Sequence, residues 1–226
     1  MNKIEIMLNL QQQLNDSTNG TGWENGMTKN GKIIDWRRCI YLEAAELVES
    51  YPWKHWKNID AQADYENIKI EAVDIWHFVM SEALRLYKIE QKGSILDLTN
   101  VICREDEYNS FCIHNNVEHV DYDSEIKIVE AFIKVLFCDE SIETIVSRFF
   151  SVAKISGLSL DTLYALYIGK NILNQFRQDH GYKEGDYIKV WDDKEDNVIM
   201  QEILNHNHDI SPEELYSKLK EAYIPN

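Results

Sequence analysis

Hydrophobic residues recur at intervals of three and four along the long stretches between Gly31 and Gly93 and between Gly93 and Gly157, where the helical period dominates over alternation. This pattern predicts helices over about 2–15, 35–50, 61–90, 124–137, 141–156, Asp161–His180 and the closing stretch "SPEELYSKLKEAY". Ser211 and Glu214 form a capping-box signature at the start of the last helix, and Gly181 is a stop signal for the one before it. We expect an all-α helical bundle.

Two parts of the chain are less regular. Residues 100–122 carry no clean period, so we expect an irregular excursion there. The chain of 226 residues is long enough for one sizeable core, and we expect a single domain over 1–226 with a candidate mobile helical sub-region around 93–157.

Composition narrows the class of protein. A formal net charge of −16 argues against nucleic-acid binding, which depends on Lys and Arg to neutralise phosphates. No stretch approaches 18 apolar residues and the first residues do not resemble a signal peptide, so we expect no membrane association. The four cysteines form no C-x-x-C pair, which is typical of reduced thiols in a cytoplasmic protein.

Two predicted helices place carboxylates on their apolar faces. Glu43 and Glu46 lie three residues apart in the helix over 35–50, and Glu71 and Asp74 repeat that spacing in the helix over 61–90. In an antiparallel helix hairpin, one register pairs Glu43 with Asp74 and also Glu46 with Glu71. All four acids then face one another, where they would repel strongly without bound cations.

Four carboxylates without cysteine favour hard cations, so we expect two or three Mg²⁺ per site with Mn²⁺ as a substitute. A di-iron site would need a Glu-x-x-His pair on each of two helices. These two helices offer only the pair Asp74 and His77, so we expect His77 to be a packed or hydrogen-bonding residue. The alternative is that all four acids are ordinary solvent-exposed residues on helix surfaces. A single pair of acids with this spacing would favour that alternative.

The second candidate group follows about a hundred residues later. Lys170, Asn174 and Arg177 share one helix face, and Lys183 and Lys189 follow on a loop with Tyr182. Arg and Lys bind phosphate, whereas Asn and Tyr suit sugar hydroxyls. Beside a metal cluster, this group indicates phosphoanhydride hydrolysis by a metal-activated water. Without the neighbouring carboxylates, the same residues would also fit an ordinary solvated helix face followed by a basic loop.

Three stretches carry a family resemblance: "LEAAELVES-PWK-WKN", "I-IEAVDIWHF" and "KNILNQFRQDHGYKEGDY-K". They resemble the dimeric dUTPases, all-α nucleotide pyrophosphohydrolases related to the MazG and dCTPase groups. The first two stretches indicate only the wider superfamily, and the third is more specific. With "LQQQLND" near the start, the resemblance covers both ends of the chain, whereas 93–157 resembles the family only in helical pattern.

The resemblance implies hydrolysis of dUTP, and typically dUDP, to dUMP with release of pyrophosphate or phosphate, which keeps uracil out of DNA. It also implies Mg²⁺ and a homodimer with active sites completed across subunits. The family's metal ligands match Glu43, Glu46, Glu71 and Asp74. One of the glutamates would orient or deprotonate the attacking water, and we favour Glu46 over Glu43.

The resemblance also implies substrate-binding residues. Lys170, Arg177, Lys183 and Lys189 match the phosphate-binding cations, and Asn174 and Tyr182 match the readers of the deoxyribose. Gln11 and Asn15 would present amides to the uracil edge, and Phe78 with Trp53 or Trp56 would pack on the base. His55 stands where related chains carry a tryptophan, which makes the selectivity for uracil over cytosine less secure than hydrolysis itself.

Two other functions remain open from the sequence. A related pyrophosphatase acting on dCTP or a damaged nucleotide would keep the metal site and differ in the base pocket. A non-enzymatic acidic helical scaffold would use the carboxylates only to stabilise the bundle, and would show no metal-dependent activity.

Overall fold

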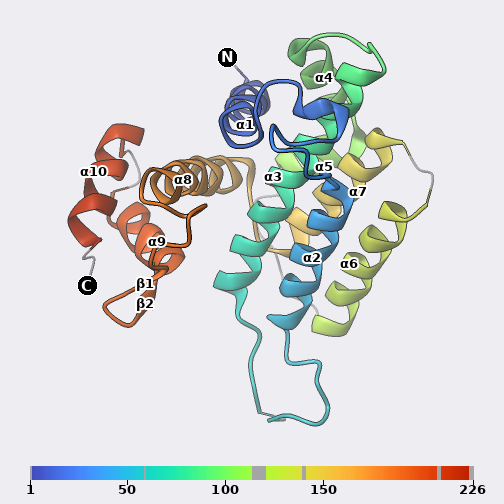
Figure 1. The fold of residues 1–226 in the computed structure, drawn as a ribbon. Helices are drawn as coiled ribbons and strands as arrows, with labels where there is room; N and C mark the ends of the chain where they lie inside the picture. The colour runs from blue at the N-terminus through green and yellow to red at the C-terminus, as the bar shows by residue number, and fades with distance from the viewer. Residues whose placement is uncertain (1, 59, 114–120, 139–140, 208–209, 224–226) are drawn as a thin grey trace. The chain divides into compact units, whose positions relative to one another are not determined.

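The computed structural model describes residues 2–58, 60–113, 121–138, 141–207 and 210–223, and nearly all of its regular structure in these residues is helical. Figure 1 shows the helices α1 (Lys3–Asn19), α2 (Trp36–Glu49), α3 (Tyr65–Ile89), α4 (Ile95–Ile102), α5 (Asp106–Ile113), α6 (Tyr122–Leu136), α7 (Ile142–Ile155), α8 (Leu160–Asp179), α9 (Asp196–His206) and α10 (Pro212–Ala222). A short 3₁₀ helix, Trp23–Asn25, and one two-stranded hairpin, β1 (Val190–Trp191) and β2 (Lys194–Glu195), complete the described elements. The predicted all-α fold is confirmed.

The chain divides into two compact units, residues 1–161 and residues 162–226. The first unit contains α1 to α7, and the second contains most of α8, the β hairpin, α9 and α10. A single domain over 1–226 stays a prediction.

Helices α2 and α3 form the predicted antiparallel hairpin (Figure 1). Asp35 caps α2 by accepting from the Arg38 N–H at 3.0 Å, and Asp64 caps α3 by accepting from the Asn67 N–H at 3.0 Å. The Asp64 N–H donates to the Ser50 carbonyl at 2.9 Å, so the loop over 51–63 is closed at its base. The hairpin therefore begins and ends at fixed points, which fixes the register of its acidic residues.

The core of the first unit centres on an aromatic cluster around Trp76 of α3. The Trp76 ring is fully buried and stacks on Phe149 of α7, with centroids 4.7 Å apart, while Phe150 lies 5.4 Å away. Aromatic pairs in this geometry add to the stabilisation from burying their area. The face of α3 opposite the carboxylates is thereby anchored to α7.

The second unit packs around Phe176 of α8. Its buried ring is surrounded by the rings of His180, Tyr187, Trp191, Tyr216 and Tyr223 at centroid distances of 3.9 to 6.3 Å. These residues come from the end of α8 and the loop after it, from the β hairpin, and from α10 and its C-cap. One aromatic side chain of α8 therefore contacts the following loop, the β hairpin and α10.

Several predicted boundaries differ from the structure. The first helix continues one turn further, to Asn19, because Gly20 with a φ of 89° is the first residue to leave the helical conformation. The prediction of an irregular excursion over 100–122 is wrong for 106–113, which form α5, and residues 114–120 lie outside the described part of the chain. A two-turn helix offers too few periodic positions to be recognised. Helix α9 and the β hairpin were not predicted.

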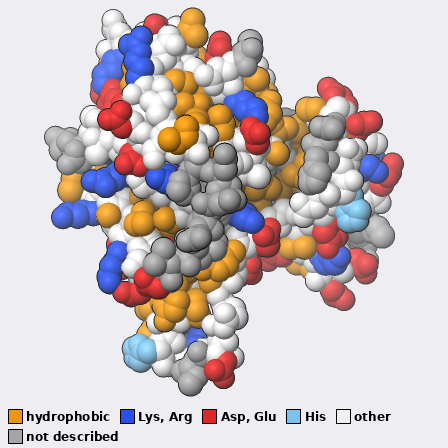
Figure 2. Space-filling view, turned by 180° about the vertical axis from the view of Figure 1, so that it is seen from behind, with side chains coloured by type: hydrophobic (Ala, Val, Ile, Leu, Met, Phe, Trp, Pro, Cys, Tyr) orange, Lys and Arg blue, Asp and Glu red, His pale blue; other side chains and the backbone are white. Residues whose placement is uncertain are grey.

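Hydrophobic side chains also reach the surface, and Figure 2 shows them among charged groups on one face. In the first unit, Tyr41 and Leu42 of α2 and Phe137 after α6 are exposed and line a hollow of about 470 Å³. Among the described residues, no helix is both long enough and apolar enough to span a bilayer.

Glu82 of α3 joins three elements of the first unit. Its buried carboxylate accepts two hydrogen bonds from Arg85, at 2.7 and 2.9 Å, and one from Arg37 of α2 at 3.3 Å. Arg37 also donates to the carbonyls of Leu136 and Cys138 at the end of α6. The network therefore links α2, α3 and α6.

We expect Glu82→Gln to lower the free energy of unfolding by about 1–3 kcal/mol. The substitution replaces a buried carboxylate, which accepts from the guanidinium groups of Arg37 and Arg85, with an uncharged amide that has only one acceptor oxygen. Urea unfolding followed by circular dichroism measures the change. The matched control is Glu66→Gln on the same helix, which breaks an exposed pair with Lys69 and should cost no more than about 0.5 kcal/mol. Equal effects of the two substitutions would contradict this role of Glu82.

Candidate functional site

Three of the four predicted metal ligands meet on the α2–α3 hairpin. Glu43, Glu46 and Glu71 each offer a carboxylate oxygen within 4.8 Å of the other two. Glu71 is buried, Glu43 is half-buried and Glu46 is exposed, so the cluster opens to solvent on the α2 side. Asp74 lies one turn further along α3, is half-buried, and is outside this three-residue group. The predicted register thus brings Glu46 and Glu71 together.

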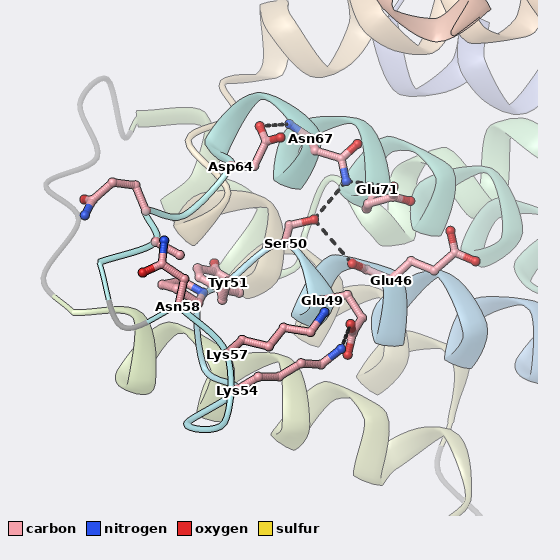
Figure 3. A pocket seen from close by; sticks show the side chains of 13 residues that line it. Glu46, Glu49, Ser50, Tyr51, Lys54, Lys57, Asn58, Asp64, Asn67 and Glu71 are labelled. Carbon is pink, nitrogen blue, oxygen red and sulfur yellow. Dashed lines mark hydrogen bonds and ion pairs between the residues drawn. The ribbon is translucent and has the colours of Figure 1, made fainter. Parts of the chain in front are cut away.

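Asn67 ties the cluster to the end of α2. Its Nδ2 donates to the Glu71 Oε1 at 3.2 Å and to the Ser50 Oγ at 2.8 Å, and the Ser50 hydroxyl donates to the Glu46 carbonyl at 3.3 Å (Figure 3). These bonds hold a carboxylate of α3 against the last turn of α2. The distance between the two helices at the cluster is therefore fixed by side-chain hydrogen bonds as well as by packing.

A cavity of about 530 Å³ lies beside the cluster, between the ends of α2 and α3 and the loop that joins them (Figure 3). Its lining is mostly polar or charged, and it consists of Glu46, Glu49, Ser50, Tyr51, Pro52, Lys54, Lys57, Asn58, Ala61, Gln62, Asp64, Asn67 and Glu71. Lys54 forms an ion pair with Glu49 on its wall. The volume is within the range of small-ligand sites, and two of the three clustered carboxylates face it.

The donor set of the cluster fits a divalent hard cation. Three carboxylates at this separation repel one another, and the repulsion is stronger for Glu71, which is shielded from water. A cation held between them would remove that repulsion. Mg²⁺ takes few protein carboxylates and completes its coordination with water and phosphate oxygens, which agrees with an open cluster beside a cavity.

The aromatic residues predicted to pack on a base occupy two places in the first unit. Trp53, His55 and Trp56 form a ring cluster on the α2–α3 loop, with Trp56 centroids 5.6 Å from Trp53 and 4.9 Å from His55. All three are exposed. Phe78 of α3 is half-buried and stacks on Trp36, with centroids 5.9 Å apart.

Gln11 and Asn15 are not on a solvated polar face. Both are buried on α1, and both donate from their amide nitrogens to the Ser81 Oγ at 3.0 Å. The Ser81 hydroxyl in turn donates to the His77 carbonyl at 2.8 Å, so its oxygen must accept from the two amides. The Gln11 Oε1 accepts from the His77 Nδ1 at 2.8 Å. The prediction of a hydrogen-bonding His77 is confirmed, and the network fixes the direction of both amides.

The three residues of the predicted phosphate-binding helix face, Lys170, Asn174 and Arg177, lie together in the second unit. Arg177 donates from its Nη1 to the Asn174 Oδ1 at 3.2 Å, and both Lys170 and Arg177 are buried. Their shared neighbour is Asn197, whose Oδ1 accepts from the Lys170 Nζ at 3.0 Å and from the Arg177 Nη2 at 3.3 Å. The two cations are thus held close together by one amide oxygen.

Sequence reasoning missed Asp196, which is the carboxylate partner of Arg177. Asp196 is almost completely buried and accepts from the Arg177 Nε and Nη2, both at 2.8 Å, and from the Tyr187 hydroxyl at 2.8 Å. Burial by itself would raise the pKa of Asp196, but the hydrogen bonds and charge of Arg177 outweigh it, so the pKa is lowered. Two buried cations signal that a carboxylate must be near. With 39 acidic residues in the chain, the sequence does not say which one.

The remaining predicted cations lie on the surface of the same unit. Lys189 and Arg177 both approach the exposed Tyr182 ring, at 5.7 and 5.9 Å from its centroid. Lys183 is exposed on the turn after α8. The Tyr182 ring therefore contacts both a buried cation and a loop cation.

Comparison with known families finds that a family model described as dUTPase matches residues 3–182. The match spans α1 to α8 and includes all three clustered carboxylates, the amides of α1 and the cations of α8. A search of curated proteins finds none that matches the chain.

We expect Glu46→Gln to raise the melting temperature of the metal-free protein by about 2–4 °C, because it removes one of three mutually repelling charges. Addition of Mg²⁺ should then raise the melting temperature of the variant less than that of the wild type, since one ligand is lost. Thermal unfolding in EDTA and in 10 mM MgCl₂ gives both values.

Glu49→Gln is the matched control for this measurement. Glu49 lies on the same helix as Glu46 and lines the same cavity, but it pairs with Lys54 and is outside the cluster. It should show no stabilisation in EDTA and the full effect of Mg²⁺. An Mg²⁺-induced shift of equal size in Glu46→Gln and the wild type would contradict a metal role for Glu46.

Proposed function

The chain belongs to the dUTPase family and is a dUTP diphosphatase, and on that premise we propose that it hydrolyses dUTP, and also dUDP, to dUMP with Mg²⁺ as its cofactor. Pyrophosphate leaves from dUTP and phosphate from dUDP. The observation that carries the cofactor proposal is the group of three carboxylates within 4.8 Å of one another beside a polar cavity. Mn²⁺ would substitute because it accepts the same oxygen ligands.

We assign the carboxylates different tasks from their exposure. Glu71 and Glu43, which are buried and half-buried, would hold the cations together with Asp74 from the next turn of α3. Glu46 is exposed at the mouth of the cluster, which suits a group that orients the attacking water and accepts its proton. Bound Mg²⁺ would supply Lewis-acid chemistry, since it acidifies a coordinated water and offsets the charge of the phosphates.

The cations of the second unit are proposed to bind the substrate's phosphates. Lys170 and Arg177 are held next to each other by Asn197, so two cationic side chains lie at one place, and Asp196 offsets one of their charges. Lys183 and Lys189 would add charge from the following loop. Asn174 and Tyr182, which contact Arg177, would meet the deoxyribose.

Recognition of uracil is proposed for the amides of α1. The Ser81 hydroxyl accepts from the amide nitrogens of Gln11 and Asn15, which fixes the direction of each amide. The Gln11 Oε1 meets the His77 Nδ1 and the Asn15 Oδ1 accepts from the Gln11 Nε2, and since an amide oxygen has two lone pairs, each would also accept from the edge of a base. A fixed pattern of donors and acceptors can discriminate uracil from cytosine, because the wrong base would leave buried groups unpaired.

Stacking on the base is proposed for Phe78 and for Trp53 or Trp56. Trp53 and Trp56 are exposed on the loop beside the cavity, so their rings are accessible. His55 offers less area to a base than a tryptophan does. We therefore expect weaker stacking there than in relatives with a tryptophan, and greater dependence on the amides.

We further propose a cytoplasmic homodimer. The exposed apolar side chains of Tyr41, Leu42 and Phe137 support an association with a second subunit, because they would be shielded from water in it. The formal net charge of −16 fits a partner set without nucleic acid.

The substrate proposal predicts Mg²⁺-dependent turnover of dUTP and dUDP that exceeds turnover of dCTP, dTTP and UTP by at least about a hundredfold in kcat/KM. Release of pyrophosphate and phosphate, followed by ion-exchange chromatography, measures it. EDTA should abolish turnover of every substrate. Turnover led by dCTP would keep the carboxylate cluster and overturn the proposed base recognition.

We expect Ser81→Ala to lower the preference for dUTP over dCTP by about tenfold, because it removes the acceptor that fixes both amides. The ratio of the two kcat/KM values measures the effect. Ser156→Ala is the matched control, since the Ser156 hydroxyl is equally buried and donates to the carbonyl four residues earlier at 2.9 Å, as Ser81 does. The same loss of preference in both variants would speak against a specific role for Ser81.

A further inference from the structure

We propose that Asp196 is a positioning residue for phosphate binding, which holds the Arg177 guanidinium in the orientation needed to meet a phosphate of the substrate. The inference rests on the proposed function, because it takes Arg177 as a phosphate-binding residue. Asp196 belongs to α9, in the part of the chain that follows residue 182. Nothing in the residue pattern around it marks it as functional.

The geometry of the Asp196–Arg177 ion pair determines which guanidinium nitrogens of Arg177 point away from Asp196. Two parallel bonds of 2.8 Å join Asp196 to the Nε and Nη2 of Arg177, so the carboxylate occupies one edge of the guanidinium plane. The Nη1 lies at the other end of the plane and donates to Asn174, the proposed reader of the deoxyribose. Asp196 therefore sets the plane of the guanidinium and directs its Nη1 end toward the side where the sugar is expected.

Asp196 is itself held by its neighbours. The Tyr187 hydroxyl donates to the Asp196 Oδ2 at 2.8 Å, and the Asp196 backbone N–H donates to the Lys189 carbonyl at 2.9 Å. Burial and the hydrogen bond to Asp196 raise the pKa of Tyr187, so its hydroxyl stays protonated as the donor. Both the side chain and the backbone of Asp196 are thus held by contacts other than those with Arg177.

The β hairpin explains how the chain brings Asp196 to this place. Val190 pairs with Glu195 and Trp191 with Lys194, and the two residues between them, Asp192 and Asp193, have positive φ angles of 49° and 63°. Two successive positive φ angles are typical of the tight turn that reverses a hairpin. The chain therefore returns to Lys189 within a few residues, which places Asp196 beside the cations that precede the hairpin.

Lys170, Arg177 and Asp196 together keep one net positive charge, which supports a role in binding an anion. Asp196 offsets one of the two charges of Lys170 and Arg177, and the neutral oxygen of Asn197 bridges the two cations at 3.0 and 3.3 Å. A buried ion pair by itself contributes little net stability compared with apolar packing. A fixed guanidinium, by contrast, gains affinity for phosphate because little of its freedom is lost on binding.

The test is Asp196→Asn, which keeps the shape of the side chain and removes its charge. We expect KM for dUTP to rise about tenfold or more, with a smaller fall in kcat, because a misplaced guanidinium binds the substrate's phosphates less well. We also expect Arg177→Gln to raise KM, and the double variant Asp196→Asn/Arg177→Gln to resemble Arg177→Gln alone. Such non-additivity shows that Asp196 acts through Arg177.

Glu82→Gln is the control for general loss of a buried carboxylate. Glu82 accepts two bonds from Arg85 in the same edge-on geometry and has no proposed role in binding. Its KM for dUTP should stay within about threefold of the wild type at temperatures well below its melting point, even where that melting point falls.

If Asp196→Asn does not fold, Asp196→Glu takes its place, because it keeps the charge and shifts the carboxylate by one methylene. Unchanged KM in the folded variant would overturn the inference, as would fully additive effects in the double variant. The proposed function fails separately: either the wild type does not hydrolyse dUTP, or Arg177→Gln leaves KM unchanged. A raised KM in Arg177→Gln together with an unchanged KM in the Asp196 variant would overturn the inference about Asp196 and leave the proposed function intact.

Discussion

Mutual repulsion among Glu43, Glu46 and Glu71 is the constraint on which the first unit is built. Like charges within 4.8 Å of one another destabilise a fold, and the protein places them on two helices that are held together from several sides. Trp76 anchors one face of α3 to α7, Arg37 and Glu82 join α2 to α3, and Asn67 bridges the cluster to the end of α2. These contacts therefore allow the hairpin to hold three carboxylates whose mutual repulsion would otherwise push its two helices apart.

The second unit also holds like charges close together, but there the charges are positive. Lys170 and Arg177 are buried cations, and the cost of removing them from water is reduced by Asp196, Asn197 and Asn174. The first unit leaves its anions near an open cavity, whereas the second supplies a partner from its own chain. The carboxylate cluster depends on a cation from solution, whereas Arg177 is neutralised within the chain by Asp196.

Most of the fold was predictable because long helices carry many periodic positions. The hairpin register that joins Glu46 to Glu71 followed from spacing alone, and the capping box at Ser211 was confirmed together with the helix stop at Gly181. Short elements were not predictable: α5 spans two turns, and α9 follows a hairpin whose strands have two residues each.

The site was predictable to the same degree. Residues that share one helix face, such as Lys170, Asn174 and Arg177, were predicted to form one group, and the structure places them together. Those that come from another element, such as Ser81 beside Gln11 or Asp196 beside Arg177, were missed, because a contact between distant segments leaves no local pattern. Family resemblance supplied the amides of α1, which spacing alone would have assigned to an ordinary polar face.

The turn at Asp192 and Asp193 has a consequence for how the sequence can vary. Both residues are exposed, so side-chain contacts would tolerate almost any replacement. Their positive φ angles tolerate far fewer, since glycine, asparagine and aspartate adopt them readily and β-branched residues do not. Substitution at these two surface positions is therefore limited to a few small residue types. The reason is that the turn they form places Asp196 beside the buried Arg177 guanidinium, although neither residue needs to contact that group itself.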